Sequence, residues 1–261
     1  MAAEEKGEIL EAIRRALWTS HNIALGPTES TLGTTTGLIG DDNRTVVIKS
    51  LIRRLLPPLP PPRVLDLGAL EGGLSLEMAR EGWAAVGVEG RRENFEKAEL
   101  IRRWFALPNL EFWHRDVKSL SAVDGPFHVI LCCGLLYHLD DPFDFLRRME
   151  GLLAPDGLLF VDTHVAAEGS VNEASLSAPA TLDGYDGRWF VEPREGSLHD
   201  RTWSAVSNER SFWPTRESLI RGIYRAGFHQ IHELFGAFDI DGEFALRAQY
   251  ARVWIAAMKQ W

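Results

Sequence analysis

Residues 64–75 read Val-Leu-Asp-Leu-Gly-Ala-Leu-Glu-Gly-Gly-Leu-Ser, a short apolar run that leads into a turn with three glycines. The run at 64–67 is typical of a buried strand, and helical spacing follows at 74–80. Glycines let the backbone come close to a ligand, and the first turn of the next helix offers unpaired N–H groups. The stretch therefore predicts a strand, a ligand-binding turn and a helix in succession.

Strands and helices continue to alternate beyond this turn. Further strands are predicted at 84–88, 110–113, 128–133, 157–162, 230–235 and 250–258, with helices at 93–105, 142–153 and 214–225. Nearly continuous apolar residues within the strands indicate a parallel sheet that is covered on both faces. We therefore predict an α/β fold with a seven-stranded, mostly parallel sheet.

Two regions lie outside this alternation. Helical patterns at 4–18 and at 41–56, joined by a Gly- and Thr-rich loop, predict an N-terminal helical cap. The cap ends at the proline-rich run 57–62, a stiff spacer, so we divide the chain into a cap and linker at 1–62 and a main domain at 63–261. Residues 164–213 hold no clear helix and many Gly and Ser residues, which predicts a lid or substrate insertion after the fifth strand.

Composition narrows the classes of partner. The formal net charge of −9, from 28 Lys and Arg against 37 Asp and Glu, argues against a nucleic-acid partner. The two cysteines, Cys132 and Cys133, are adjacent in an apolar run and fit free thiols in a reducing cytosol. We see no secretory signal and no apolar run long enough to span a bilayer, so we expect a cytoplasmic protein without a membrane partner.

Two nucleotide-containing cofactors, NAD and S-adenosylmethionine, are candidate ligands of the glycine-containing turn. Ala69 or Leu70 stands where a dinucleotide fingerprint needs its middle glycine, whereas S-adenosylmethionine (SAM) has no phosphate and tolerates a side chain there. Glu89 ends the second strand, where a carboxylate can accept hydrogen bonds from the ribose hydroxyls of either cofactor. Asp116 and Val117 follow the third strand and suit an adenine ring. Together these residues favour SAM over NAD.

Several segments resemble class I methyltransferases, and more narrowly the group that includes the tRNA wobble-uridine methyltransferases. The turn at 64–75 is similar to their SAM-binding turn, and 133–142 (Cys-Gly-Leu-Leu-Tyr-His-Leu-Asp-Asp-Pro) is similar to their fourth-strand motif. Asp162-Thr163-His164 and Phe212-Trp213-Pro214-Thr215 match later motifs, and 18–31 faintly resembles the segment before the core. The resemblance is strongest at 63–163. It implies a Rossmann-like fold and SAM as cofactor.

The resemblance also implies a set of cofactor residues. Gly68, Glu89, Asp116 and Val117 would bind SAM, and the turn at 133–135 would pass beneath its methionine part. The full set of candidate cofactor residues is Asp66, Gly68, Ala69, Glu71, Gly72, Glu89, Gly90, Asp116, Val117, Cys133 and Gly134.

Two histidines are candidate catalytic residues. His138 and His164 fall at or just beyond the carboxyl ends of strands, where a substrate lies in this kind of sheet. A hydroxyl that attacks the methyl group must lose a proton, and a histidine is the usual acceptor. His199 is a weaker third candidate. These histidines with Asp162 could be imagined around a metal, but no tight ligand spacing supports one, so no metal is predicted.

Aromatic residues are candidate substrate contacts. Tyr137, Trp189, Trp203 and Trp213 either line a substrate pocket or form the small core of the insertion. The function that follows is a SAM-dependent methyltransferase, which transfers a methyl group to oxygen of an aromatic or carboxylated small molecule, with a homodimer allowed. Alternatives are a tRNA wobble-uridine-modifying enzyme, a non-catalytic SAM-binding protein and an NAD-dependent oxidoreductase.

Overall fold

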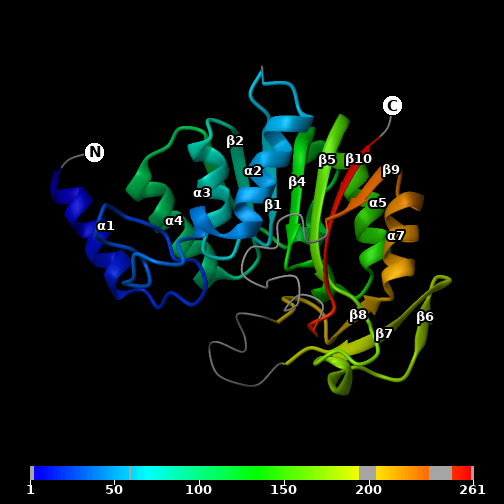
Figure 1. Ribbon diagram of the computed structural model, residues 1–261. Coiled ribbons are helices and arrows are strands. Elements are labelled where there is room, and N and C mark those ends of the chain that lie inside the picture. Colours follow the sequence, from blue (N-terminus) through cyan, green and yellow to red (C-terminus); the bar gives the residue numbers. More distant parts are fainter. Residues whose placement is uncertain (1–2, 59, 194–203, 235–248, 260–261) are drawn as a thin grey trace. The chain divides into compact units, whose positions relative to one another are not determined.

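The computed structural model describes residues 3–58, 60–193, 204–234 and 249–259 (Figure 1). The chain forms two compact units, Met1–Val117 and Lys118–Trp261. Trp203 and His199, both candidate site residues, lie outside the described residues. No helix in the described part of the chain is long and apolar enough to cross a membrane.

The first unit combines the N-terminal helices with three parallel strands. The strands lie in the order β3-β2-β1, with bounds Arg63–Leu67 (β1), Ala84–Glu89 (β2) and Leu110–His114 (β3). The helices are α1 (Ala3–Arg15), α2 (Asn43–Leu55), α3 (Gly73–Arg80) and α4 (Arg92–Phe105). α1 ends three residues earlier than predicted and packs against α4. The side chain of Asp42 caps α2 by accepting hydrogen bonds from the N–H groups of Arg44 and Thr45.

The second unit contributes four strands of the main sheet. They lie in the order β4-β5-β10-β9, with bounds Phe127–Cys133 (β4), Leu153–His164 (β5), Phe228–Glu233 (β9) and Arg252–Lys259 (β10). β4 and β5 are parallel, whereas β10 runs antiparallel to both β5 and β9. Helices α5 (Pro142–Leu152) and α7 (Arg216–Arg225) pack against each other. The two units thus supply the seven strands of the predicted, mostly parallel fold.

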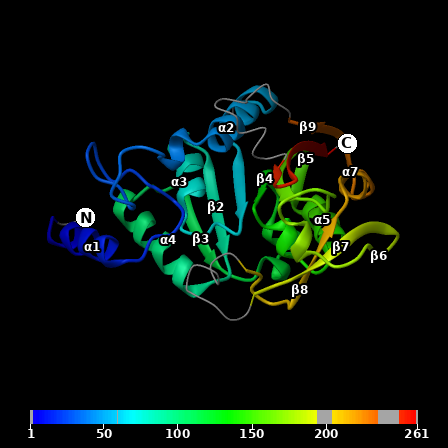
Figure 2. The ribbon, with the colours of Figure 1, turned by 60° about the horizontal axis from the view of Figure 1, so that its bottom comes forward.

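The region after β5 contains a small sheet that the sequence did not predict. Its strands are β6 (Ala180–Leu182), β7 (Tyr185–Val191) and β8 (Arg210–Pro214), and β7 pairs antiparallel with both neighbours. Figure 2 shows β7 and β8 side by side. Pro214 was expected in the first turn of a helix, but it ends β8. Helix α7 is capped instead by Thr215, whose hydroxyl accepts from the N–H of Ser218.

Candidate active site

The turn between β1 and α3 has an unusual backbone. Gly68, Leu70 and Gly72 have positive φ angles of 70°, 52° and 81°. Leucine rarely adopts this left-handed conformation, so its presence at position 70 marks a constrained site. The N–H groups of Gly68 and Ala69 both donate to the carbonyl of Val88 at 2.9 Å, which fastens the turn to β2.

A hydrogen bond to Glu89 helps to hold Leu70 in its left-handed conformation. Its carboxylate, only 5% exposed, accepts from the N–H of Leu70 at 2.8 Å and from the N–H of Arg91 at 2.7 Å. Burial raises the pKa of Glu89 to about 7, although these two backbone hydrogen bonds act in the opposite direction. A carboxylate at the end of β2 is thus held in place by the turn itself.

Glu71 binds several donors of the protein itself. Its fully buried carboxylate accepts from the N–H groups of Thr19, Ser20 and His21 at 2.8, 3.1 and 2.8 Å and from the ammonium of Lys97 at 2.9 Å. Burial alone would raise its pKa, but the hydrogen bonds outweigh burial and lower it. Protein donors thus reach both oxygens, and the predicted contact of Glu71 with SAM stays a prediction. The side chain of Glu71 holds the segment 19–21 against the turn.

The glycines at 72 and 73 are required by packing. A Cβ at Gly72 would lie 2.6 Å from the ring of Phe112, and one at Gly73 would lie 2.9 Å from Nδ1 of His21. That nitrogen accepts the N–H of Gly73 at 2.9 Å, and burial lowers the pKa of His21 to about 4. A close fit between protein groups therefore explains these two glycines without a ligand.

The remaining candidates of the first unit lie around the same strand ends. Asp66 is buried in β1 and accepts from the hydroxyl of Ser75 at 2.6 Å, and burial raises its pKa to about 6. Gly90 follows β2 and is half-buried. Asp116 and Val117 follow β3, with Asp116 half-buried and Val117 buried. Their predicted contacts with SAM stay predictions.

The turn after β4 contains the two predicted cofactor residues of the second unit. Cys133 is the last residue of β4 and is half-buried, while Gly134 has a φ of 73° and donates its N–H to the carbonyl of Asp162 at 2.8 Å. A Cβ at Gly134 would lie 3.6 Å from the hydroxyl of Tyr137 and 3.7 Å from a guanidinium nitrogen of Arg252. Two polar side chains thus lie close to this open stretch of backbone.

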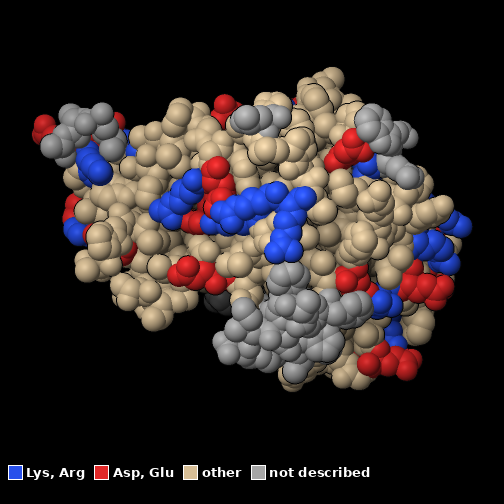
Figure 3. Space-filling model, turned by 45° about the horizontal axis from the view of Figure 1, so that its top comes forward, with Lys and Arg blue, Asp and Glu red and all other residues tan. Residues whose placement is uncertain are grey.

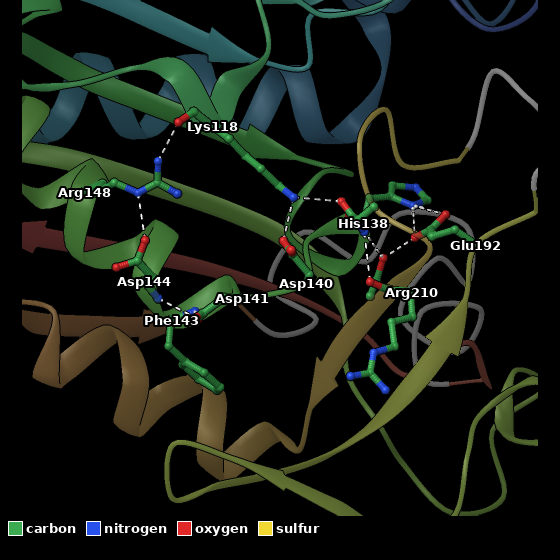
Figure 4. Close-up of polar contacts among 11 residues, drawn as sticks. Lys118, His138, Asp140, Asp141, Phe143, Asp144, Arg148, Glu192 and Arg210 are labelled. Atoms are coloured by element: carbon green, nitrogen blue, oxygen red, sulfur yellow. Dashed lines mark hydrogen bonds and ion pairs between the residues drawn. The ribbon is translucent and has the colours of Figure 1, made fainter.

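His138 lies one short turn further along and is paired with a buried acid. Its Nδ1 is 3.0 Å from Oε1 of Glu192, and Figure 4 shows the imidazole turned toward that carboxylate. Glu192 is 3% exposed and also accepts from the hydroxyl of Ser211 and from the N–H of Ala205 at 2.8 Å. Asn208 donates its amide to the carbonyl of His138 at 3.0 Å. This network fixes the orientation of the imidazole.

His164, the other candidate base, is enclosed by aromatic rings. Its ring stacks on Trp213 with 5.1 Å between centroids and meets the edge of Tyr137 at 4.6 Å. Its Nδ1 is 2.9 Å from the carbonyl of Tyr250. Burial, followed by the charge of Arg252, lowers the pKa of His164 to about 4.

The tryptophans predicted to contact substrate differ in their surroundings. Trp213 is 4% exposed, donates its indole N–H to the carbonyl of Tyr137 at 2.8 Å and also stacks on Phe190. Its burial and its two stacked neighbours favour the core alternative for Trp213, and its predicted substrate contact stays a prediction. Trp189 is half-buried, and the guanidinium of Arg210 lies 4.1 Å from its ring centroid.

Sequence reasoning did not find Glu192, Ser211 or Asn208. None belongs to a recognisable motif, and the first lies 54 residues from its histidine partner. Within the described ranges, no three His, Cys, Asp or Glu side chains lie together so that they could hold a metal ion.

Comparison with known proteins identifies the family. Residues 41–233 match the family model described as a methyltransferase domain. The tRNA U34 carboxymethyltransferase of Syntrophotalea carbinolica is 33% identical over 111 residues, which are 42% of this chain and 34% of that protein. The ubiquinone biosynthesis O-methyltransferase of Ruegeria pomeroyi is 29% identical over 167 residues, which are 64% of this chain and 62% of that protein. The chain thus spans less than two thirds of the length of these curated relatives.

Solved structures agree on the fold. The N-terminal domain of EvdMO1 with SAH (S-adenosylhomocysteine) bound has a TM-score of 0.72 at 24% identity, covering 100% of this chain and 98% of that one. The CurJ carbon methyltransferase has a TM-score of 0.56 at 17% identity, covering 83% of this chain and 54% of that one. The family match over most of the chain, together with this fold, confirms the resemblance drawn from 63–163: the chain has the class I methyltransferase fold and belongs to the methyltransferase domain family.

Proposed function

We propose that the chain uses SAM to methylate a hydroxyl oxygen of a small molecule, with His138 as the general base. The observation that carries this proposal is the 3.0 Å contact between Nδ1 of His138 and the buried carboxylate of Glu192. A carboxylate that accepts the Nδ1 proton leaves Nε2 unprotonated and able to take a proton. Several curated relatives are named as ubiquinone biosynthesis O-methyltransferases, which supports oxygen as the methyl acceptor.

The first unit fits the cofactor chemically. Each oxygen of Glu89 accepts one backbone N–H, and a carboxylate oxygen can accept a second hydrogen bond, so both ribose hydroxyls can be bound. Gly68 presents backbone without a side chain, which allows close approach. We assign Asp116 and Val117 to the adenine ring. When bound, SAM supplies a methyl group that its sulfonium makes electrophilic.

The second unit supplies the proton acceptor. Nε2 of His138 would accept the proton that the substrate hydroxyl loses on methylation, and Glu192 would stabilise the resulting imidazolium. His164 is the poorer base because burial lowers its pKa to about 4. We therefore assign the base role to His138.

Charge favours a small acceptor over tRNA. The net charge is −9, and Figure 3 shows a gathering of Lys and Arg side chains on one face with acidic side chains beside it. Helices α2 and α3 pair such charges, Lys49 with Glu77 at 2.5 Å and Arg53 with Glu81. Basic groups that are already paired gain little from binding phosphates. We therefore propose an aromatic or carboxylated small molecule, and a cytoplasmic setting because both cysteines are free thiols.

Two linked measurements test this function. Calorimetric titration should show micromolar binding of SAM and SAH and no binding of NAD. SAH release is then followed with panels of phenols and hydroxy acids. His138→Ala should lower turnover on an active acceptor by about 10²–10⁴-fold, the usual contribution of a general base, whereas His164→Ala should lower it less than about tenfold. Glu192→Gln keeps the size of the side chain and should lower kcat more than it changes KM.

Other outcomes would overturn parts of the proposal. No binding of SAM or SAH would remove the cofactor assignment. A larger loss of turnover in His164→Ala than in His138→Ala would reverse the base assignment. A salt-sensitive complex with tRNA, with methyl transfer to it, would favour the wobble-uridine alternative.

A further inference from the structure

A cavity of about 480 Å³ lies in the second unit, on the same network as His138. Its volume falls within the range of sites for small molecules. Its walls come from the residues that follow the His138 turn, from β7 and from the segment that leads into β8. They include Asp140, Asp141, Trp189, Asn208, Glu209 and Arg210.

Carboxylates form the accepting side of this cavity. Asp140 accepts from the ammonium of Lys118 at 2.6 Å, as Figure 4 shows. Burial alone would raise the pKa of Asp140, but the hydrogen bond and charge of Lys118 outweigh burial and lower it. Asp141 caps α5 through Oδ1, which accepts from the N–H groups of Phe143 and Asp144 at 3.1 and 2.8 Å, while Oδ2 takes no part in the cap.

An amide and a guanidinium form the donating side. Asn208 donates to the carbonyl of His138 at 3.0 Å and accepts from Lys118 at 3.0 Å, so it joins the cavity wall to the candidate base. The guanidinium of Arg210 lies over the ring of Trp189. It can donate to a ligand but cannot accept from one.

We propose that this cavity binds a hydroxyl-rich, sugar-like part of the methyl acceptor. Carboxylates only accept hydrogen bonds and a guanidinium only donates them, whereas a hydroxyl does both and satisfies either wall. An anionic ligand would meet three carboxylates, and a cationic ligand would meet Arg210. A flat apolar ligand would find the face of Trp189 already covered.

This inference rests on the proposed methylation of a hydroxyl oxygen and specifies the part of the acceptor that carries this hydroxyl; an aromatic or carboxylated part would lie outside this cavity. The cavity would hold the ring while one of its hydroxyls reacts. The O–H bond breaks and its proton goes to Nε2 of His138. The oxygen forms a bond to the methyl carbon as the C–S bond of SAM breaks, which yields a methyl ether and SAH. The imidazolium then returns its proton to water.

The test measures binding apart from turnover. Methyl α-D-glucopyranoside serves as the probe in saturation-transfer NMR with the full chain and SAH. Arg210→Met keeps the aliphatic stem on Trp189 but removes the donor, so the probe affinity should fall about tenfold. Arg221→Met is the matched control, because the guanidinium of Arg221 also lies over an aromatic ring, that of Tyr185, at 5.2 Å and does not line the cavity.

The wild type and Arg221→Met should show equal saturation transfer to the probe. No transfer from the wild type, or equal losses in both arginine variants, would overturn the sugar-like ligand. Measuring SAH release as well distinguishes failure of the proposed methylation from failure of the proposed sugar-like ligand. If phenols are methylated and the glycoside does not bind, only this inference fails. If the glycoside binds as expected but no acceptor releases SAH, the cavity assignment stands and the methylation proposal fails.

Discussion

Ionisation of Glu89 should control the affinity for SAM. Its carboxylate is buried at the end of β2, and burial raises its pKa to about 7 against the hydrogen bonds from the N–H groups of Arg91 and Leu70. The ribose hydroxyls need an ionised acceptor for their strongest hydrogen bonds. With a pKa of about 7, roughly one tenth of the molecules carry ionised Glu89 at pH 6 and roughly nine tenths at pH 8. SAM should therefore bind about tenfold more weakly at pH 6, a difference of about 1.4 kcal/mol.

Calorimetry at pH 6, 7 and 8, in two buffers with different ionisation enthalpies, measures both the affinity and the protons released on binding. Proton release should be largest near pH 6 and small at pH 8. Glu89→Gln is the matched control, since it keeps the shape and cannot ionise. This variant should bind SAM more weakly at pH 8 and should lose most of the pH dependence.

The same group predicts how stability changes with pH in the absence of SAM. Because its pKa in the folded state lies above the ordinary 4.5, its stabilising contribution is fully present below pH 4.5 and is lost as the pH rises through 7. His21 and His164, with pKa values of about 4, titrate below the window used for binding. A wild-type affinity that stays within twofold between pH 6 and 8 would refute the reasoning, as would an unchanged pH slope in Glu89→Gln.

Two further predictions concern the turn between β1 and α3. Glu71→Ala should lower the free energy of unfolding by about 3–5 kcal/mol, because it leaves the buried ammonium of Lys97 without its carboxylate; urea denaturation checks this, and a loss below about 1 kcal/mol would contradict it. Gly72→Ala should lower the free energy of unfolding by about 2–4 kcal/mol, because of the left-handed backbone and the clash with Phe112. Thermal denaturation checks this. The loss caused by Gly72→Ala should be smaller in a Phe112→Leu background than in the wild type, and an equal loss in both would contradict the clash.

The sequence predicts the first three strands of the main sheet well, and in β1 and β2 nearly every residue is buried. The runs at 64–67, 84–88 and 110–113 agree with β1, β2 and β3 to within a residue at either end. The insertion was harder to predict. In β7, Asp, Gly and Arg stand in a row between Tyr185 and the adjacent Trp189 and Phe190, so no period of two stands out. Proline fits both the first turn of a helix and the end of a strand, so the sequence alone does not assign Pro214. Its pairing with Gly187 assigns it to β8.

The two glutamates beside the turn show why the site was only partly predictable. Glu71 and Glu89 both stand where a SAM-binding acid fits the sequence pattern, and both prove to be buried. The two glutamates differ in the groups that donate hydrogen bonds to them. Glu71 receives the ammonium of Lys97 and three N–H groups from the distant segment 19–21, so its charge is neutralised within the protein. Glu89 receives two N–H groups from its own neighbourhood, and these hydrogen bonds together with the charge of Arg91 do not outweigh burial, which raises its pKa.

A carboxylate that burial destabilises more than its protein partners stabilise it gains most from a ligand that brings two hydroxyl donors. The difference between the donors of Glu71 and of Glu89 depends on which distant segment packs against each acid, and the spacing of residues along the chain does not predict it. The same reasoning applies to His138 and His164, which have similar positions in the sequence. One is turned toward the buried Glu192, and the other is enclosed by Trp213 and Tyr137. The type of residue and its position at a strand end predict where chemistry can occur, and the packed surroundings decide which of two similar residues performs it.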